Sequence, residues 1–174
     1  MSRSSITDQV DIRREILLLW SISKRGTIGR YRLREIMNLS EGVTRGLLKR
    51  YQERGFVVAK KSVGCHLTSK GQQRLHSLLR KYRMVDVREF DAGPLKLASN
   101  SVVIHVKKAA LKIRFGLEQR DAAVKAGAAG ATLIVFRNGR LLVPPEYGDL
   151  ASQDQQIARK LAKEFSPMEN DVLV

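Results

Sequence analysis

The sequence predicts an α+β protein with two small domains, and three observations support this. Its 174 residues suit one ordinary domain or two small ones, and 43% hydrophobic residues are enough for a core. Spacings typical of helices and of strands occur in both halves. Near residue 90 the composition changes, where Asp91-Ala92-Gly93-Pro94 breaks a long basic helical segment. We therefore expect a first domain at residues 1–83, a linker at 84–98 and a small mixed α/β domain at 99–174.

Positive charge is the strongest feature of the composition. The chain has 32 Lys and Arg against 17 Asp and Glu, a formal net charge of +15. Residues 1–90 hold 20 basic and 8 acidic side chains, whereas residues 91–174 hold 12 and 9. From Gly42 to Arg83, Glu53 is a single acid among 11 basic residues. This concentration indicates a polyanionic partner for the first half and makes the second half a poor candidate for another nucleic-acid surface.

Several other protein classes are not expected. No apolar run approaches the roughly 18 residues of a transmembrane helix, and the polar segment 1–11 lacks a signal-peptide core. The single cysteine, Cys65, fits a reducing compartment, so we expect a cytoplasmic protein. Cys65 and His66 are neighbours on a predicted strand and point to opposite faces, so no metal site is expected. His76 and His105 complete no catalytic triad, and we expect neither an enzyme nor a cofactor.

Helices and one hairpin are expected in the first half. The hydrophobic spacing places helices at about 10–24, 29–37, 41–54 and 69–83, and strands at 56–59 and 65–67. Ser40 is a suitable N-cap for the third helix, and Gly55 ends it. The buried face of this helix is expected to hold Val43, Leu47, Leu48 and Tyr51.

A helix, a short turn and a second helix with a basic outer face form a geometry that fits the DNA major groove. Three segments carry a resemblance at this point: Ser40-Glu41-Gly42-Val43-Thr44-Arg45-Gly46-Leu47-Leu48, Gly55-Phe56-Val57, and Gly64-Cys65-His66-Leu67-Thr68-Ser69-Lys70-Gly71. Over residues 10–83 the chain resembles the winged helix-turn-helix family. Gly29-Arg30-Tyr31-Arg32-Leu33 looks especially like archaeal members. The whole chain looks like an uncharacterised archaeal family in which such a domain precedes a short domain with a Glu-Gln-Arg-Asp-Ala-Ala helix.

The resemblance implies duplex DNA binding by the helix at 41–54 and by the basic turn at 60–64, the wing. The candidate contact residues are Ser40, Thr44, Arg45, Lys49, Gln52, Lys60 and Lys61. Arg45 and Lys49, four residues apart, can donate to guanine O6 and N7, and Gln52 could pair with adenine. The two hydroxyl residues lie near the helix N-terminus, where they could meet phosphate, and the two wing lysines would contact backbone or minor groove. For each residue the alternative is a solvated side chain.

The second half predicts a compact mixed α/β unit. Strands are expected at 101–106, 131–136 and 140–143, helices at 117–125 and 152–165, a turn at Asn138-Gly139 and a loose tail at 168–174. Residues 107–115 are ambiguous between helix and extended chain. The first turns of the helix at 117–125 carry four polar residues that could receive a small ligand or form a solvated helix start: Glu118, Gln119, Arg120 and Asp121.

We therefore expect a DNA-binding transcriptional regulator: an N-terminal winged helix-turn-helix domain followed by a small mixed α/β domain that senses a small-molecule effector or mediates dimerisation. A homodimer reading two half-sites is expected. Leu75, Leu79 and Tyr82 could form its seam or pack inside their own domain. The alternatives are a small enzyme with a DNA-binding appendage and an RNA-binding winged-helix protein. A low aromatic content of 6% weakly disfavours surfaces that stack single strands.

Overall fold

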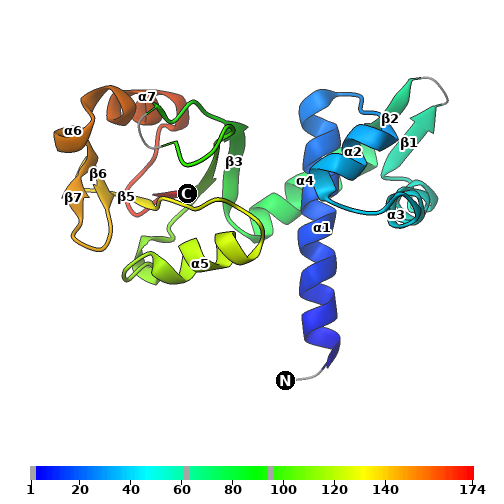
Figure 1. Ribbon diagram of the computed structural model, residues 1–174, viewed down its shortest axis with the longest axis horizontal. Coiled ribbons are helices and arrows are strands. Elements are labelled where there is room, and N and C mark those ends of the chain that lie inside the picture. Colours follow the sequence, from blue (N-terminus) through cyan, green and yellow to red (C-terminus); the bar gives the residue numbers. More distant parts are fainter. Residues whose placement is uncertain (1–2, 61–62, 94–95) are drawn as a thin grey trace. The chain divides into compact units, whose positions relative to one another are not determined.

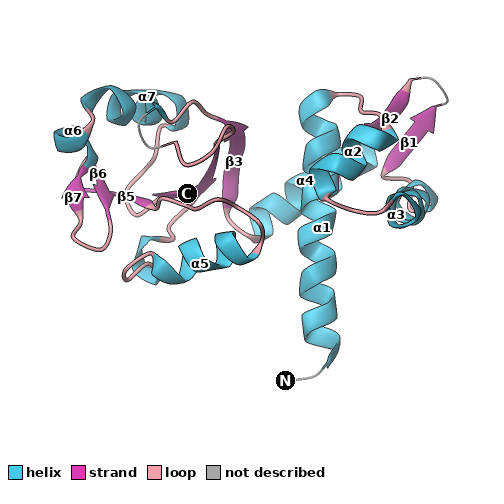
Figure 2. Cartoon of the chain, in the orientation of Figure 1, coloured by secondary structure: helices cyan, strands magenta, loops and turns pink. Residues whose placement is uncertain are grey.

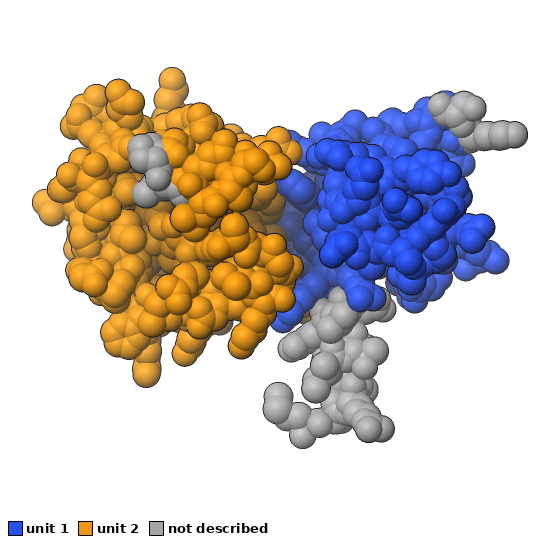
Figure 3. Space-filling model, viewed as in Figure 1, with its two compact units in different colours: residues 1–79 blue, residues 80–174 orange. Residues whose placement is uncertain are grey.

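The computed structural model describes residues 3–60, 63–93 and 96–174, with side chains from Ile12 onward (Figures 1 and 2). The chain divides into two compact units, Met1–Leu79 and Arg80–Val174, which Figure 3 draws in two colours. We call them unit 1 and unit 2. The architecture is mixed α and β, and each unit has an antiparallel sheet of its own. No helix within the described ranges is long and apolar enough to cross a membrane.

Unit 1 follows the expected order of elements. In chain order it contains α1 (Arg3–Arg25), α2 (Arg30–Met37), α3 (Glu41–Glu53), β1 (Val57–Lys60), β2 (Gly64–Leu67) and α4 (Ser69–Lys81). The predicted bounds agree within a few residues, except that α1 begins earlier than expected. β1 and β2 form the hairpin, and α3 contacts β1 directly (Figure 1).

The core of unit 1 lies between its helices and the hairpin. Leu18, Leu19 and Ile22 of α1 are fully buried and belong to one cluster with residues of every other element of the unit. Leu75 of α4 is buried in the same cluster, and Leu79 packs against it. Most of the stripe considered as a dimer seam is therefore used inside its own unit, because α4 needs that face to cover the core.

The junction between the hairpin and α4 explains why Thr68 and Gly71 stand where they do in the sequence. The hydroxyl of Thr68 donates to the carbonyl of Gly55 at 2.6 Å and accepts from the N–H of Gly71 at 3.0 Å. A Cβ atom at Gly71 would lie 2.0 Å from the carbonyl oxygen of Phe56. The first turn of α4 thus approaches the backbone before β1 so closely that only glycine fits there.

Unit 2 is built around one sheet with the strand order β3-β4-β8-β5-β6-β7. Its elements in chain order are β3 (Met84–Glu89), β4 (Val102–Val106), the 3-10 turn η2 (Ala110–Lys112), α5 (Leu117–Lys125), β5 (Ile134–Arg137), β6 (Arg140–Val143), β7 (Gly148–Asp149), α6 (Leu150–Gln153), α7 (Gln155–Phe165) and β8 (Val172–Leu173). All neighbouring strands are antiparallel. Asn138-Gly139 forms the expected turn between β5 and β6.

Both faces of this sheet are covered. Ile134 packs in a cluster with Leu161 and Phe165 of α7, whereas its neighbour Val135 packs in a second cluster with Ile113 beside η2. Because successive side chains of a strand point to opposite faces, the two clusters lie on opposite sides of the sheet.

Two expectations for the second half are wrong. The predicted linker at 84–98 begins as strand β3, which pairs along its length with β4. The predicted loose tail at 168–174 contains β8, whose residues Val172 and Leu173 are buried between β4 and β5.

The ambiguous segment 107–115 contains the 3-10 turn. The predicted helix at 152–165 is divided, because Asp154 ends α6 and caps α7.

Candidate nucleic-acid interface

The orientation of α3 differs from the expected one by one residue. Its buried side chains are Thr44, Leu47, Leu48 and Tyr51, spaced at i, i+3, i+4 and i+7. Val43, expected inside, is 48% exposed, whereas Thr44 is fully buried. The hydroxyl of Thr44 donates to the carbonyl of Ser40 at 2.9 Å, which satisfies it within the helix. The expectation that Thr44 meets phosphate is therefore wrong, because its side chain faces the core.

Ser40 has the position expected for an N-cap. It is exposed, and its hydroxyl accepts from the N–H of Val43 at 3.4 Å. Glu41 follows it in the first turn and pairs with Arg30 of α2 at 3.2 Å. The arginine thus offsets the negative charge of Glu41 at the helix N-terminus, where free N–H groups favour an anion.

The outward face of α3 presents the remaining candidates of the helix. Arg45, Lys49 and Gln52 are all exposed. Nζ of Lys49 lies 3.9 Å from Oε1 of Glu53. Because this ion pair is exposed to solvent, it holds the lysine only weakly. Arg45 makes no ion pair or hydrogen bond with the residues that the structure describes. Its guanidinium is therefore available to a partner.

Two glycines leave the helix backbone on this face uncovered by side chains. Gly42 and Gly46 are exposed, and a Cβ atom at either position would have no heavy atom within 4 Å. Glycine inside a helix costs about 0.5–1 kcal/mol relative to alanine, and neither residue offsets this cost by packing. The absence of side chains at these positions would let a partner approach the helix backbone beside Arg45.

The base of the hairpin is anchored to the loop after α1. Ile28 and Cys65 exchange backbone hydrogen bonds of 3.0 and 2.8 Å, so the loop after α1 adds a short third strand segment to the hairpin. Gly64 has φ +109°, and a Cβ there would lie 2.7 Å from the Ile28 carbonyl oxygen. Lys60 is exposed at the end of β1, opposite Gly64. The second wing lysine, Lys61, lies outside the described residues.

Not every basic residue of this region is available. Arg74 of α4 makes two hydrogen bonds, of 2.8 and 3.0 Å, to the carboxylate of Glu15, which is only 5% exposed. The hydrogen bond to Glu15 raises the pKa of Arg74 above its usual value. One of the 11 basic residues from Gly42 to Arg83 is thus already paired inside unit 1. The signal for this pair in the sequence is Glu15, an acid among the apolar residues of α1.

The four residues expected to receive a ligand in unit 2 do not form a site. Glu118, Arg120 and Asp121 are exposed and Gln119 is half-buried. Arg120 bonds to its neighbour Asp121 at 3.2 Å. Unit 2 does contain a cavity of about 490 Å³, but none of these four residues is among those that line it. The helix start is solvated, as the alternative interpretation held.

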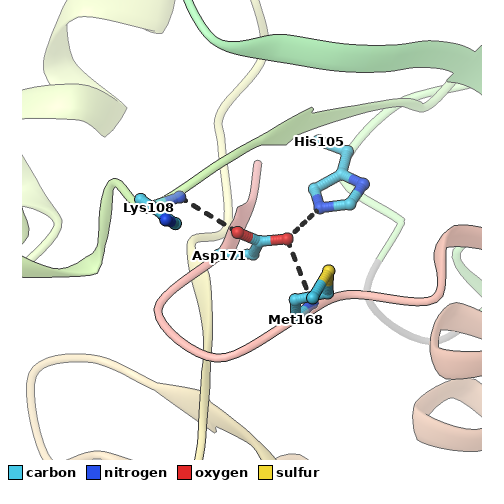
Figure 4. A network of polar contacts seen from close by, with 4 residues as sticks. All are labelled: His105, Lys108, Met168 and Asp171. Carbon is cyan, nitrogen blue, oxygen red and sulfur yellow. Dashed lines mark hydrogen bonds and ion pairs between the residues drawn. The ribbon is translucent and has the colours of Figure 1, made fainter.

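A buried polar network in unit 2 was not expected. His105 and Asp171 are 3% and 1% exposed, and Nε2 of His105 donates to Oδ2 of Asp171 at 2.8 Å (Figure 4). The N–H groups of Met168 and Lys108 donate to the same carboxylate at 3.0 Å each. Burial alone would raise the pKa of Asp171, but these hydrogen bonds outweigh it and the pKa lies below its usual value. The network fixes the segment that enters β8.

Residues 97–174 match a domain of unknown function, DUF4443. Among solved structures, the chain is similar to hypothetical protein PH0730 from Pyrococcus horikoshii OT3, with a TM-score of 0.70 and 20% sequence identity over 93% of this chain and 79% of that chain. At this identity the likeness concerns the fold alone. No curated protein matches the chain. The expected resemblance is thus met at a coarse level, by an uncharacterised C-terminal domain and an archaeal structure of similar fold.

Unit 1 therefore presents one chemically distinct surface. It combines an exposed helix face that carries cationic and amide side chains with two bare glycine positions and a lysine at the adjoining hairpin. Such a surface can donate hydrogen bonds to phosphate oxygens and to base edges, and it offers few acids that would repel a polyanion.

Proposed function

We propose that the protein is a DNA-binding transcriptional regulator whose unit 1 is a winged helix-turn-helix domain. The observation that carries the proposal is the outward face of α3, where Arg45, Lys49 and Gln52 are exposed beside bare glycine backbone. In this proposal α3 enters the major groove, and the hairpin after it contacts flanking phosphates through Lys60. The order of elements in unit 1 and the concentration of positive charge in the first half support it.

Unit 2 is the regulatory part in this proposal. Its near balance of 12 basic and 9 acidic residues after position 90 favours effector sensing or assembly over a second nucleic-acid surface. The active form is proposed to be a homodimer that reads two half-sites. Since Leu75 and Leu79 are used in the core of unit 1, the dimer contact would have to lie on other residues.

The test is a selection of bound fragments from genomic duplex DNA, with a matched pool of RNA as the competitor. We expect enrichment of a duplex sequence with two half-sites, and binding that weakens steeply with salt. Preferred retention of RNA would contradict the proposal in favour of the RNA-binding alternative. Equal retention of all fragments, with no recovered motif, would leave a basic protein without sequence readout and would also contradict it.

A further inference from the structure

The helix α5 of unit 2 carries its large apolar side chains on the outside. None of its residues is buried, and the half-buried ones are Gln119 and Ala123, one turn apart on the side that faces its own unit. Leu117 and Val124 are 48% and 49% exposed. At 3.6 residues per turn both point in nearly the same direction, about 130° away from the half-buried side. The helix thus turns two large apolar residues to the solvent.

The exposed apolar surface continues before the start of α5. Phe115 is 61% exposed. The chain around it is fixed, since the hydroxyl of Tyr147 lies 3.0 Å from the carbonyl oxygens of both Ile113 and Arg114. Gly116, which follows the phenylalanine, is buried and has φ +76°. An apolar ring whose backbone is already held in place loses little conformational freedom when a partner covers it.

The opposite end of α5 carries small residues. Ala126-Gly127-Ala128 directly follows the helix, and all three residues are exposed. In an antiparallel pair of α5 helices, the residues before one helix lie beside those after the other. Phe115 of each copy would therefore cover the three small residues of the second copy, and Leu117 would meet Val124. The large and small ends of this face match each other in size.

The charges on this face are self-complementary in the same way. Glu118 and Lys125 are exposed and seven residues apart, so they project from one side of the helix at opposite ends. Two antiparallel copies place Glu118 of one beside Lys125 of the other, twice in the dimer. The midpoint of this pair and that of Leu117 with Val124 are one residue apart, about 1.5 Å along the helix. One two-fold axis near Asp121 therefore serves both contacts.

We propose that two copies of the protein dimerise through α5, packed antiparallel about this two-fold axis. The face matches itself in size and in charge, which favours a second copy over an unrelated partner. The nine residues of α5 span about 14 Å, so the interface is of the small kind, and we expect a dissociation constant in the micromolar range. This contact rests on the homodimer of the proposed function but not on DNA binding, and it can be measured without DNA.

The first test reverses one charge at a time. In Glu118→Lys the two positions are both basic, and in Lys125→Glu both are acidic, so each homodimer would hold two like-charge pairs. Sedimentation velocity of the full chain without DNA should show each variant dimerising about tenfold more weakly than the wild type. An equimolar mixture of the two variants should dimerise as tightly as the wild type, because both contacts of the heterodimer regain opposite charges. Lys163→Glu makes the same charge change at an exposed position of α7 and should leave dimerisation unchanged.

Three results would overturn the proposal. A wild type that stays monomeric up to about 200 µM would show that a different molecule covers this face. A mixture that dimerises no better than either variant alone would exclude the pairing of Glu118 with Lys125. Equally tight dimers in all variants would place the contact on another surface, while the proposed homodimer itself would stand. Duplex DNA binding is measured separately, so none of these results depends on it.

The second test removes the acid at the two-fold axis. Nη2 of Arg120 lies 3.2 Å from Oδ1 of Asp121 in the same chain and offsets part of its charge. The two copies of Asp121 still lie close together across the axis, so Asp121→Asn should tighten the dimer by about two- to threefold. Loss of a carboxylate near a helix N-terminus weakens the helix, so a purely structural role predicts the opposite sign. A dimer that is weaker or unchanged in this variant would overturn the proposed axis.

Discussion

Arg45 is an exposed side chain of α3 that is available to a polyanion, since no described residue pairs with it. We predict that Arg45→Ala weakens binding to the selected DNA by about 1–3 kcal/mol and relaxes the preference for one base, as expected for a guanine contact. Fluorescence anisotropy with the selected site and single-base variants measures both effects. Arg140→Ala, which removes an exposed arginine from unit 2, is the control and should leave affinity unchanged. Equal effects of the two variants would exclude a specific role for Arg45.

We predict that Gly46 lowers the stability of unit 1 and allows DNA to approach the α3 backbone closely. Gly46→Ala should raise the free energy of unfolding of unit 1 by about 0.5–1 kcal/mol, because alanine restricts the unfolded chain and meets no atom in the folded one. The same methyl group should weaken DNA binding, since it lies on the face proposed to meet the groove. Urea unfolding followed by the fluorescence of Trp20, the single tryptophan, measures the stability of unit 1. A variant that is more stable and binds DNA as well as the wild type would place the interface elsewhere.

Asp171 makes unit 2 sensitive to acid. Because its pKa is lower in the folded state than in the unfolded state, its contribution to stability is present above about pH 4 and is lost as the pH falls through the folded value. We predict that Asp171→Asn lowers the stability of unit 2 by about 1.5–3 kcal/mol at pH 7, since it loses charged hydrogen-bond acceptors. The difference from wild type should shrink toward pH 3. Circular dichroism during urea unfolding at several pH values tests this, and the signal of Trp20 in unit 1 should not change.

Which of Val43 and Thr44 faces the core could not be predicted from the sequence. Val43 and Thr44 are adjacent, and both fit a helix face of about the observed width. The valine is the more apolar residue, so hydrophobicity alone favours burying it. The threonine is buried instead because its hydroxyl can bond to the carbonyl of Ser40, one turn earlier. That bond depends on geometry at the helix start, which the hydrophobic pattern does not contain.

At the scale of elements, the junction of the hairpin with α4 is the most constrained. We predict that Gly71→Ala destabilises unit 1 by about 3 kcal/mol, because the added methyl group would overlap the carbonyl oxygen of Phe56. Gly42→Ala is the matched control, since its added methyl group meets no atom. Thermal unfolding of both variants tests the prediction. A melting temperature for Gly71→Ala equal to that of the control would mean that this junction adjusts freely.

The long periodic elements of unit 1 could be predicted from sequence, and the short strands of unit 2 could not. α2, α3 and α4 have apolar spacings over two or more turns, and each is bounded by a capping residue or a glycine. β8 has two residues, too few for any period, and it is a strand only because β4 and β5 bind it from both sides. Met84–Glu89 falls in the predicted linker, because the sequence pattern marks no strand there, and it is a strand because it pairs with β4.

At the scale of the whole molecule, the uneven distribution of charge predicts how binding responds to salt. The excess of basic residues belongs mainly to the first 90 positions. We predict that Lys60→Ala reduces the slope of log affinity against log salt by about 0.9, the value for one phosphate contact, for every DNA sequence alike. Arg137→Ala in unit 2 should leave the slope unchanged. Titrations at several salt concentrations decide this, and an unchanged slope for Lys60→Ala would remove that lysine from the interface.

Cys65 gives the protein a built-in reporter. It is the single cysteine, it is buried in the core of unit 1, and its backbone pairs with Ile28 where the hairpin meets the loop after α1. Burial raises the pKa of its thiol, and the nearby charge of Arg30 lowers it by less, so the folded protein holds the thiol in its unreactive form. An alkylating reagent can modify it only when this corner opens. The rate of modification therefore reports how often the hairpin opens. DNA bound to the hairpin should slow this rate, and the measurement needs no engineered cysteine.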